Sequence, residues 1–180
     1  GGDGDSYDPI IASGANGALP HATPSDKKVE SGDFIVMDFG SLYKGYHADM
    51  TRTIVVGKAS ERHHEIYNIV LESQLAGIAA ARSGIKCSDL DHACREVIDA
   101  KGYGKLFMHS TGHGLGLEVH TMPRITWMNH SLLEENNVIT IEPGIYIAGW
   151  GGVRIEDDCL ILKDECRPMN SSTKELLVVD

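Results

Sequence analysis

The sequence predicts an α+β domain in which helices cover one face of a curved antiparallel sheet. Two strand-rich stretches of hairpin form lie towards the two ends of the chain, and two helix-patterned segments stand together between them. Runs of strands with segregated helices are typical of this fold class. Because 180 residues suit one domain with a sizeable core, residues 1–180 are expected to form a single domain.

The N-terminal part of the chain is predicted to supply the first hairpin. Residues 1–5 are predicted to form a flexible lead and residues 7–12 a short strand. A segment rich in Gly, Pro, Ser and Asp, residues 13–33, is predicted to form a loop. The apolar and β-branched runs 34–39 and 46–56 are then expected to pair as the two strands of the hairpin.

Two helices are predicted after this hairpin. Ser60 has the character of an N-cap, and apolar residues at helical spacing follow it as far as residues 83–84. A second helix is expected over residues 89–101, with Ser88 as its N-cap and Gly102 ending it. The helices therefore stand side by side in the sequence, as the α+β class requires.

Strands dominate the remainder of the chain. Short strands are predicted at residues 106–110 and 116–120, and a connecting stretch follows them. A second hairpin is predicted over residues 138–162, and a last strand over residues 176–179. The two hairpins hint at an internal duplication, in which only the second half has two helices before its strands.

Composition narrows the class of function. A hydrophobic content of 42% and a charged content of 23% are ordinary for a soluble globular protein. The net charge of −10 argues against nucleic acid or a membrane surface as partner. The start of the chain has neither the basic nor the apolar region of a signal peptide. The four cysteines contain no Cys-x-x-Cys motif, so free thiols and a cytoplasmic location are expected.

Each hairpin carries two carboxylates that are predicted to face each other. A turn near Tyr43–Lys44 would set Asp38 opposite Asp49, and a turn at Gly149 would set Glu142 opposite Glu156. Directly opposed like charges on antiparallel strands destabilise a sheet. Two such pairs suggest that positive charge lies between them, and a pair of metal ions is the simplest candidate. The alternative for Asp38 alone is a strand-end residue that caps a turn.

Histidines near the carboxylates fit the same interpretation. His113 lies between glycines, which allow the backbone and a metal to approach its ring closely. Carboxylates with one imidazole suit Mn, Co, Fe or Zn better than Ca. His109 and His120 flank it, and Arg154 precedes Glu156 by two residues on the same strand face. A loop histidine, a structural histidine and a surface arginine are the respective alternatives for His113, His120 and Arg154.

Other chemistries lack their motifs. The chain has no Gly-x-Ser-x-Gly, no His-Glu-x-x-His and no P-loop, and its Gly-x-Gly-x-Gly run has the wrong spacing for a dinucleotide loop. The remaining histidine-bearing helix and loop positions are interpreted as solvated and without a function; they are His63, His64, His92 and His130.

Taken together, six stretches resemble the pita-bread metallopeptidase family, which includes methionine aminopeptidase and the Xaa-Pro peptidases. The matching stretches are residues 13–21, 37–40, 45–53, 109–120, 140–146 and 152–157. Met-Thr-Arg-Thr, Pro-His-Ala and Glu-Pro-Gly-Ile-Tyr resemble the Xaa-Pro branch, which comprises aminopeptidase P and prolidase. The methionine aminopeptidase branch usually has His-Gly-Ile-Pro where this chain has Pro20-His21-Ala22.

The resemblance implies a site with two divalent metal ions, with Mn favoured over Co, Zn or Fe. Carried over residue by residue, it implies that Asp49 and Glu156 bridge the ions, that Asp38 completes one metal site, and that His113 and Glu142 complete the other. The catalytic residues that it implies besides the bridging ligands are Glu142, His109 and His120. The substrate-binding residues that it implies are His21, His120 and Arg154.

The implied reaction is hydrolysis of an Xaa-Pro bond by a hydroxide that bridges the metals, with a peptide carrying proline at its second position as substrate. Glu142 would pass a proton to the leaving nitrogen, and His120 would steady the oxyanion. Three alternatives remain open: a non-catalytic binding module on the same fold, a metal-free hydrolase that uses only histidines, and a methionine aminopeptidase-like activity.

Two departures from the family pattern set a further expectation. Thr121 stands where the family commonly has an acidic residue. The helical pair that family members carry before the first strands is missing, as is the N-terminal domain of Xaa-Pro enzymes. The first hairpin would then expose an apolar face. We therefore expect a fragment of a longer protein, whose exposed face is covered by a second copy of the chain or by the missing N-terminal segment.

Overall fold

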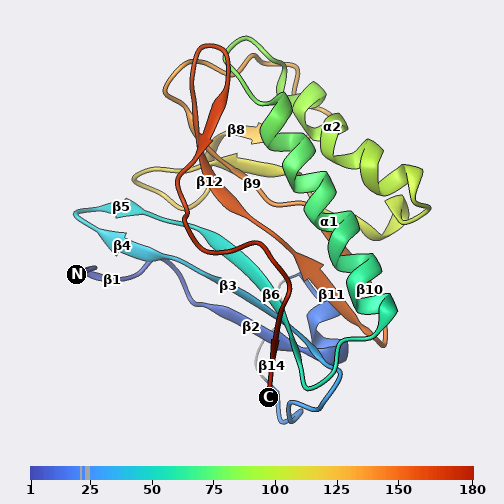
Figure 1. Cartoon of the computed structure of the whole chain (residues 1–180). Coiled ribbons are helices and arrows are strands. Elements are labelled where there is room, and N and C mark those ends of the chain that lie inside the picture. The colour runs from blue at the N-terminus through green and yellow to red at the C-terminus, as the bar shows by residue number, and fades with distance from the viewer. Residues whose placement is uncertain (21, 23–24) are drawn as a thin grey trace.

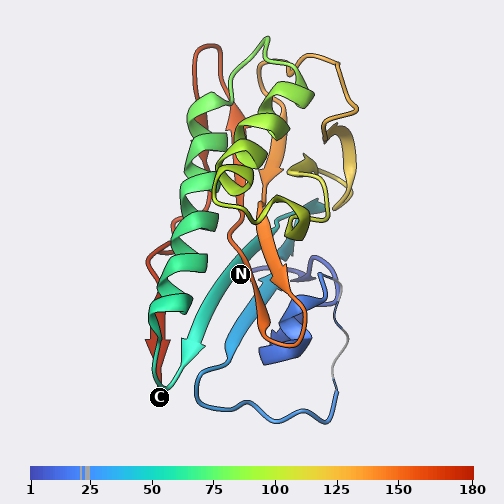
Figure 2. The ribbon, with the colours of Figure 1, turned by 90° about the vertical axis from the view of Figure 1, so that its right-hand side faces the viewer.

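The computed structural model describes residues 1–20, 22 and 25–180. Two half-sheets meet along the middle of the molecule, and two helices lie side by side against one side of it (Figures 1 and 2). The helices are α1 (Glu61–Ala80) and α2 (Cys87–Ala100), and they pack on each other and on the second half-sheet. Neither helix is long and apolar enough to cross a membrane.

The first half-sheet contains the first hairpin and the C-terminus. Its strands, in spatial order, are β14 (Leu177–Val179), β6 (Met50–Val56), β3 (Phe34–Phe39) and β2 (Ile10–Ser13). A smaller sheet extends the hairpin, in the order β1 (Gly4–Asp5), β4 (Ser41–Tyr43) and β5 (Tyr46–His47). The expected strand at 7–12 thus begins three residues later, at Ile10, and the loop after it contains a 3-10 helix, η1 (Gly14–Ala18).

The hairpin turn lies one position later than the sequence suggested. Lys44 and Gly45, at φ of 50° and 81°, form its tip. Asp38 consequently pairs with Thr51, and Asp49 lies between β5 and β6. The prediction that Asp38 and Asp49 are directly opposed is therefore wrong. They are diagonal neighbours, because Asp49 precedes the partner of Asp38 by two residues and so shares its face of the sheet.

The second half-sheet holds the other candidate residues. Its strands are β13 (Cys166–Pro168), β12 (Asp157–Ile161), β9 (Val138–Ile141), β7 (Gly112–Gly114) and β8 (Thr121–Ile125). The hairpin of β10 (Gly144–Ile147) and β11 (Gly151–Arg154) continues β9 and β12. Because Ile141 pairs with Asp157 and Gly144 with Arg154, Glu142 lies across from Glu156, as expected.

The structure at the starts of the two helices corrects the predictions made for His63 and Ser88. Ser60 caps α1 as expected: its hydroxyl accepts from the amide of His63, and the His63 ring accepts from the amide of Ser60. His63 is therefore buried against Phe34 rather than solvated. The second helix begins at Cys87, with Lys86 at the N-cap position, so Ser88 lies inside the helix and does not cap it; the Ser88 amide donates to the carbonyl of Asn129.

The segment before β7 also differs from the prediction. The strands expected at 106–110 and 116–120 are absent from the described chain; η2 (Gly104–Leu106) and a loop stand there, and the real strands are β7 and β8. The guanidinium of Arg95 explains the loop, because it donates to the carbonyls of Phe107 and His109, at 3.0 and 2.5 Å, which a sheet ladder would otherwise use.

The helices cover the core but leave one face of the first half-sheet bare. Strand β3 alternates: Phe34 and Val36 are buried, while Met37 is only half-buried and Phe39 is 39% exposed. Leu177 of β14 is 47% exposed on the same outer surface. A shallow groove on this outer face is lined largely by apolar side chains; they include Met37, Phe39, Met50, Ile54, Tyr67 and Leu177.

Candidate metal centre

A cavity of about 140 Å³ lies where the two half-sheets meet. All five predicted metal ligands line it, together with the other described residues to which the sequence assigned a role. These lining residues are Asp38, Asp49, His109, His113, His120, Glu142, Arg154 and Glu156. His21, the remaining predicted site residue, lies outside the described residues. The cavity is therefore built from both halves of the chain, and both carboxylate hairpins open into it.

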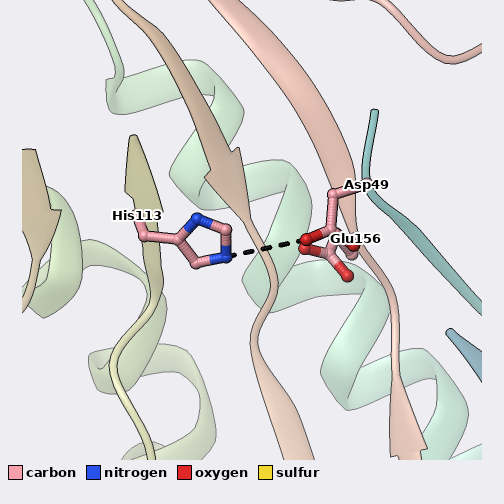
Figure 3. A group of neighbouring side chains, drawn as sticks. All are labelled: Asp49, His113 and Glu156. Carbon is pink, nitrogen blue, oxygen red and sulfur yellow. Dashed lines mark ion pairs between the residues drawn. The ribbon is translucent and has the colours of Figure 1, made fainter. Parts of the chain in front are cut away.

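Three side chains form the tightest cluster in the described part of the chain. Ligand atoms of Asp49, His113 and Glu156 all lie within 4.8 Å of one another. Figure 3 shows the two carboxylates side by side with the imidazole ring turned towards them. The Nε2 atom of His113 lies 3.7 Å from Asp49 Oδ2 and 3.3 Å from Glu142 Oε1. Asp49, His113 and Glu156 are all buried, so one residue from each of three separate chain segments meets in the interior of the cavity.

Strand β6 fixes these ligands against the other half of the molecule. The Thr51 hydroxyl donates to Glu156 Oε2 at 2.5 Å, and the Glu156 amide donates to the Thr51 carbonyl at 3.1 Å. The Asp49 amide donates to a carboxylate oxygen of Asp158, also at 3.1 Å. These contacts form a seam between β6 and the β11–β12 segment, and the seam places Asp49 beside Glu156.

Arg154 holds the fourth carboxylate. Arg154 is only 3% exposed, and its guanidinium donates to Asp38, to the Tyr146 hydroxyl at 2.7 Å and to the Thr51 hydroxyl at 3.0 Å. The interpretation of Arg154 as a surface residue is therefore excluded. Tyr7, which no sequence motif singled out, donates from its hydroxyl to the carboxylates of Asp38 and Asp49.

The charges of the cluster are poorly compensated by the protein itself. Burial, together with repulsion from Asp38 and Glu142, raises the pKa of Asp49 to about 7. Burial and the neighbouring carboxylates also raise the pKa of Glu156 well above its usual range. Burial opposes ionisation of Glu142 too, but the hydrogen bond from His113 and the positive charges of His109, His113 and Arg154 together outweigh it and lower the pKa of Glu142 to about 2. Divalent cations would supply the missing positive charge, so the donor set fits a metal site.

Two further histidines extend the site. His109 Nδ1 lies 2.8 Å from the Ser110 carbonyl, and its Nε2 lies 2.8 Å from the Tyr146 hydroxyl. Since Tyr146 also accepts from Arg154, a chain of hydrogen bonds runs from Arg154 to His109. His120 is exposed at the mouth, with its ring 4.3 Å from that of His113. Burial and the charge of His113 lower the pKa of His120.

Sequence reasoning missed several residues of this site. Tyr7, Thr51, Tyr146 and Asp158 touch the predicted residues directly, and Arg124 lines the cavity. Thr51 and Tyr146 stand in stretches that the resemblance covered, yet no role was given to them. Arg124 lies outside those stretches. Tyr7 and Asp158 carry no local signal, because each meets its partner across a large sequence separation.

Comparison with known proteins places this geometry in a family. The profile of metallopeptidase family M24 matches residues 1–163. The chain is 51% identical over 171 residues to the Xaa-Pro dipeptidase of Pyrococcus furiosus, covering 95% of this chain and 49% of that protein. It is 48% identical over 179 residues to the uncharacterized peptidase YqhT of Bacillus subtilis, covering 99% of this chain and 51% of that one.

Solved structures agree. The prolidase from Pyrococcus furiosus superposes with a TM-score of 0.94 at 49% identity, over 96% of this chain and 51% of that one. The X-Pro aminopeptidase from Thermotoga maritima gives a TM-score of 0.97 at 46% identity, over 99% and 51%. The chain thus spans about half the length of these relatives, and the predicted α+β pita-bread fold is confirmed. The chain belongs to metallopeptidase family M24.

Proposed function

We propose that the chain forms the catalytic part of a metal-dependent exopeptidase that hydrolyses Xaa-Pro peptide bonds. The observation that carries the proposal is the cavity where Asp49, His113 and Glu156 come together with Asp38 and Glu142. Relatives named Xaa-Pro dipeptidase and Xaa-Pro aminopeptidase support the substrate class. A peptide with proline at its second position is therefore the proposed substrate, and the cytoplasm remains the predicted location.

The proposed cofactor is a pair of divalent ions. Asp49 and Glu156 would bridge them, Asp38 would complete one metal site, and His113 with Glu142 would complete the other. Oxygen donors with a single imidazole favour Mn, with Co, Zn or Fe as alternatives. When bound, such a pair supplies a hydroxide nucleophile near neutral pH and polarises the scissile carbonyl.

Glu142 is the proposed proton carrier. The nitrogen of an Xaa-Pro bond is a tertiary amide nitrogen without hydrogen, so it needs a proton before it can leave. Glu142 Oε1 accepts from the Thr140 hydroxyl at 3.0 Å and lies 3.3 Å from His113, which fixes the carboxylate at the cavity wall. His120, at the cavity mouth, is suited to steady the developing oxyanion, and His109 supports the site through Tyr146.

The two arginines that line the cavity suit different tasks. Arg154 is buried and hydrogen-bonded to Asp38, so orientation of that ligand fits its surroundings better than contact with substrate. Arg124 is exposed at the cavity and is suited to meet a substrate carboxylate. Activity towards dipeptides that depends on Arg124 would favour a dipeptidase over an aminopeptidase. His21 remains a predicted substrate contact.

Besides a metal-free hydrolase that uses only histidines, which activity surviving exhaustive chelation would favour, two alternatives stay open beside this proposal. A non-catalytic binding module of the same fold would bind peptide without cleaving it. A methionine aminopeptidase-like enzyme would instead release N-terminal methionine from peptides without proline. The motifs that favour the Xaa-Pro branch, and the names of the relatives, weigh against both. Assays with an Xaa-Pro dipeptide, an Xaa-Pro tripeptide and a Met-Ala peptide separate the three.

The first prediction concerns Glu142. Glu142→Gln removes the proton carrier while leaving an oxygen donor of similar shape, so activity on an Xaa-Pro peptide should fall by about 10²–10⁴-fold. Asp49→Ala should instead reduce the metal content, because it removes a proposed bridging ligand. Steady-state kinetics and metal analysis of both purified variants check this contrast. Hydrolysis by Glu142→Gln at the wild-type rate would show that the assigned role is wrong.

The second prediction concerns pH. The pKa of Asp49 is about 7 in the fold and near 3.8 in an unfolded chain, so in that interval the fold holds a proton that the unfolded chain has lost. The stability contributed by this proton is lost as pH rises through 7. The melting temperature of the metal-free protein should therefore fall between about pH 4 and 7 and level off above pH 7. Mn²⁺ should restore it most at the upper end. A flat metal-free profile would contradict this account of the cluster.

The third prediction concerns the bare face of the first half-sheet. We propose that a second copy of the chain, or further polypeptide such as the twice-longer relatives contain, covers Phe39, Leu177 and their neighbours. Burying this surface is worth about 25 cal/mol per Å². Light scattering after size exclusion should give a dimer or larger assembly for the 180-residue chain, and Phe39→Ser should weaken it. A cooperative, well-behaved monomer would show that the chain closes its own core.

A further inference from the structure

Asp158 lies behind the proposed metal ligands and has no role in the function proposed above. It is on β12, only 5% exposed, and comes from the half of the molecule opposite to Asp49. One of its carboxylate oxygens, Oδ2, accepts the amide hydrogen of Asp49 at 3.1 Å. Asp49 lies between β5 and β6. The Asp158 carboxylate accepts the amide hydrogen of Asp49 there, as the carbonyl of a neighbouring strand would within a sheet.

The second oxygen of Asp158 is unusual. Within the described residues, Asp158 Oδ1 is a fully buried side-chain polar atom with no hydrogen-bond partner. A buried carboxylate with an unpartnered oxygen destabilises a fold, and more so when other carboxylates are near. The carboxylate is kept although it costs stability, so the one contact that its side chain makes, with the amide of Asp49, points to a task besides holding the strands together.

Asp157, the residue before Asp158, is an equally buried acid with a purely structural role. Asp157 is fully buried and fully paired, with Arg52 at 2.6 Å, Lys174 at 2.7 Å and Gln74 at 3.0 Å. Its partners tie β6, α1 and the C-terminal segment together. Asp158 takes no part in that network, and its side-chain contact is with the backbone of Asp49 alone. Asp157 therefore contacts side chains that hold the fold together, whereas Asp158 contacts the backbone of a candidate metal ligand.

We propose that Asp158 is a positioning residue for the metal site: by accepting the Asp49 amide it fixes the backbone from which the bridging carboxylate projects. This inference rests on the proposed function, since it takes Asp49 as a ligand. A carboxylate that bridges two ions must be aimed closely, and residues behind the ligands commonly supply that aim. Because Asp158 and Glu156 belong to the same segment, Asp158 also sets Asp49 relative to the second bridging ligand.

Two substitutions of nearly equal size separate this role from others. Asp158→Asn keeps an oxygen that can accept the Asp49 amide, whereas Asp158→Leu removes every acceptor. The full chain and both variants are stripped of metal and titrated with Mn²⁺ by calorimetry. Asp158→Asn should bind close to the wild type, and Asp158→Leu about 10–100-fold more weakly. Asp157→Asn is the matched control: it should lower the metal-free melting temperature and leave Mn²⁺ affinity unchanged.

The outcomes are distinct. Equal losses of affinity in both Asp158 variants would show that its charge matters rather than its acceptor, and would overturn the inference. Unchanged affinity in both would overturn it as well. Should Asp158→Leu fail to fold in metal-free thermal melts, Asp158→Ala takes its place with the same expected loss. A wild-type chain that binds no Mn²⁺ would contradict the proposed function itself, which separates the failure of the two proposals.

Discussion

The structure depends on one constraint, the cost of gathering several carboxylates in a largely buried cavity. Asp49 and Glu156 are almost fully buried, and Asp38 and Glu142 stand beside them. Hydrogen bonds from Arg154, Tyr7, Thr51 and His113 offset part of the repulsion, and the raised pKa values of Asp49 and Glu156 show what is left. A fold that keeps such a cluster at this cost is organised around a cation.

The fold meets this constraint by building the site at a seam rather than on one element. Asp49 projects from the first half-sheet and Glu156 from the second, and β6 holds the two sheets together through Thr51. Glycines let the strands approach at the centre: a Cβ on Gly112, next to His113, would lie 1.9 Å from the Thr140 carbonyl oxygen. Tight backbone contact therefore fixes the imidazole of His113 beside the proposed ligands Asp49 and Glu156.

Much of this arrangement could be predicted from the sequence, because hairpins and motifs are local. Alternation and turn residues indicated the pairing of Glu142 with Glu156, and the family resemblance indicated the ligand set that lines the cavity. The turn of the first hairpin was predicted one position too early. Its tip includes Lys44 with a positive φ, a conformation that a lysine does not indicate in a sequence. The strand expected at residues 106–110 failed because Arg95 takes the carbonyls of Phe107 and His109. Tyr7 and Asp158 could not be predicted, since their partners lie 31 to 109 residues away.

The central claim, that these carboxylates hold two metal ions, is tested most directly by anomalous diffraction at the manganese edge from crystals grown with Mn²⁺. The account predicts two peaks inside the cavity, about 3.5–4 Å apart, with Asp49 and Glu156 both in contact with each of them. Asp38 should reach one peak only, and His113 and Glu142 the other. A cavity without anomalous signal at saturating Mn²⁺, or a single peak remote from Asp49 and Glu156, would contradict it.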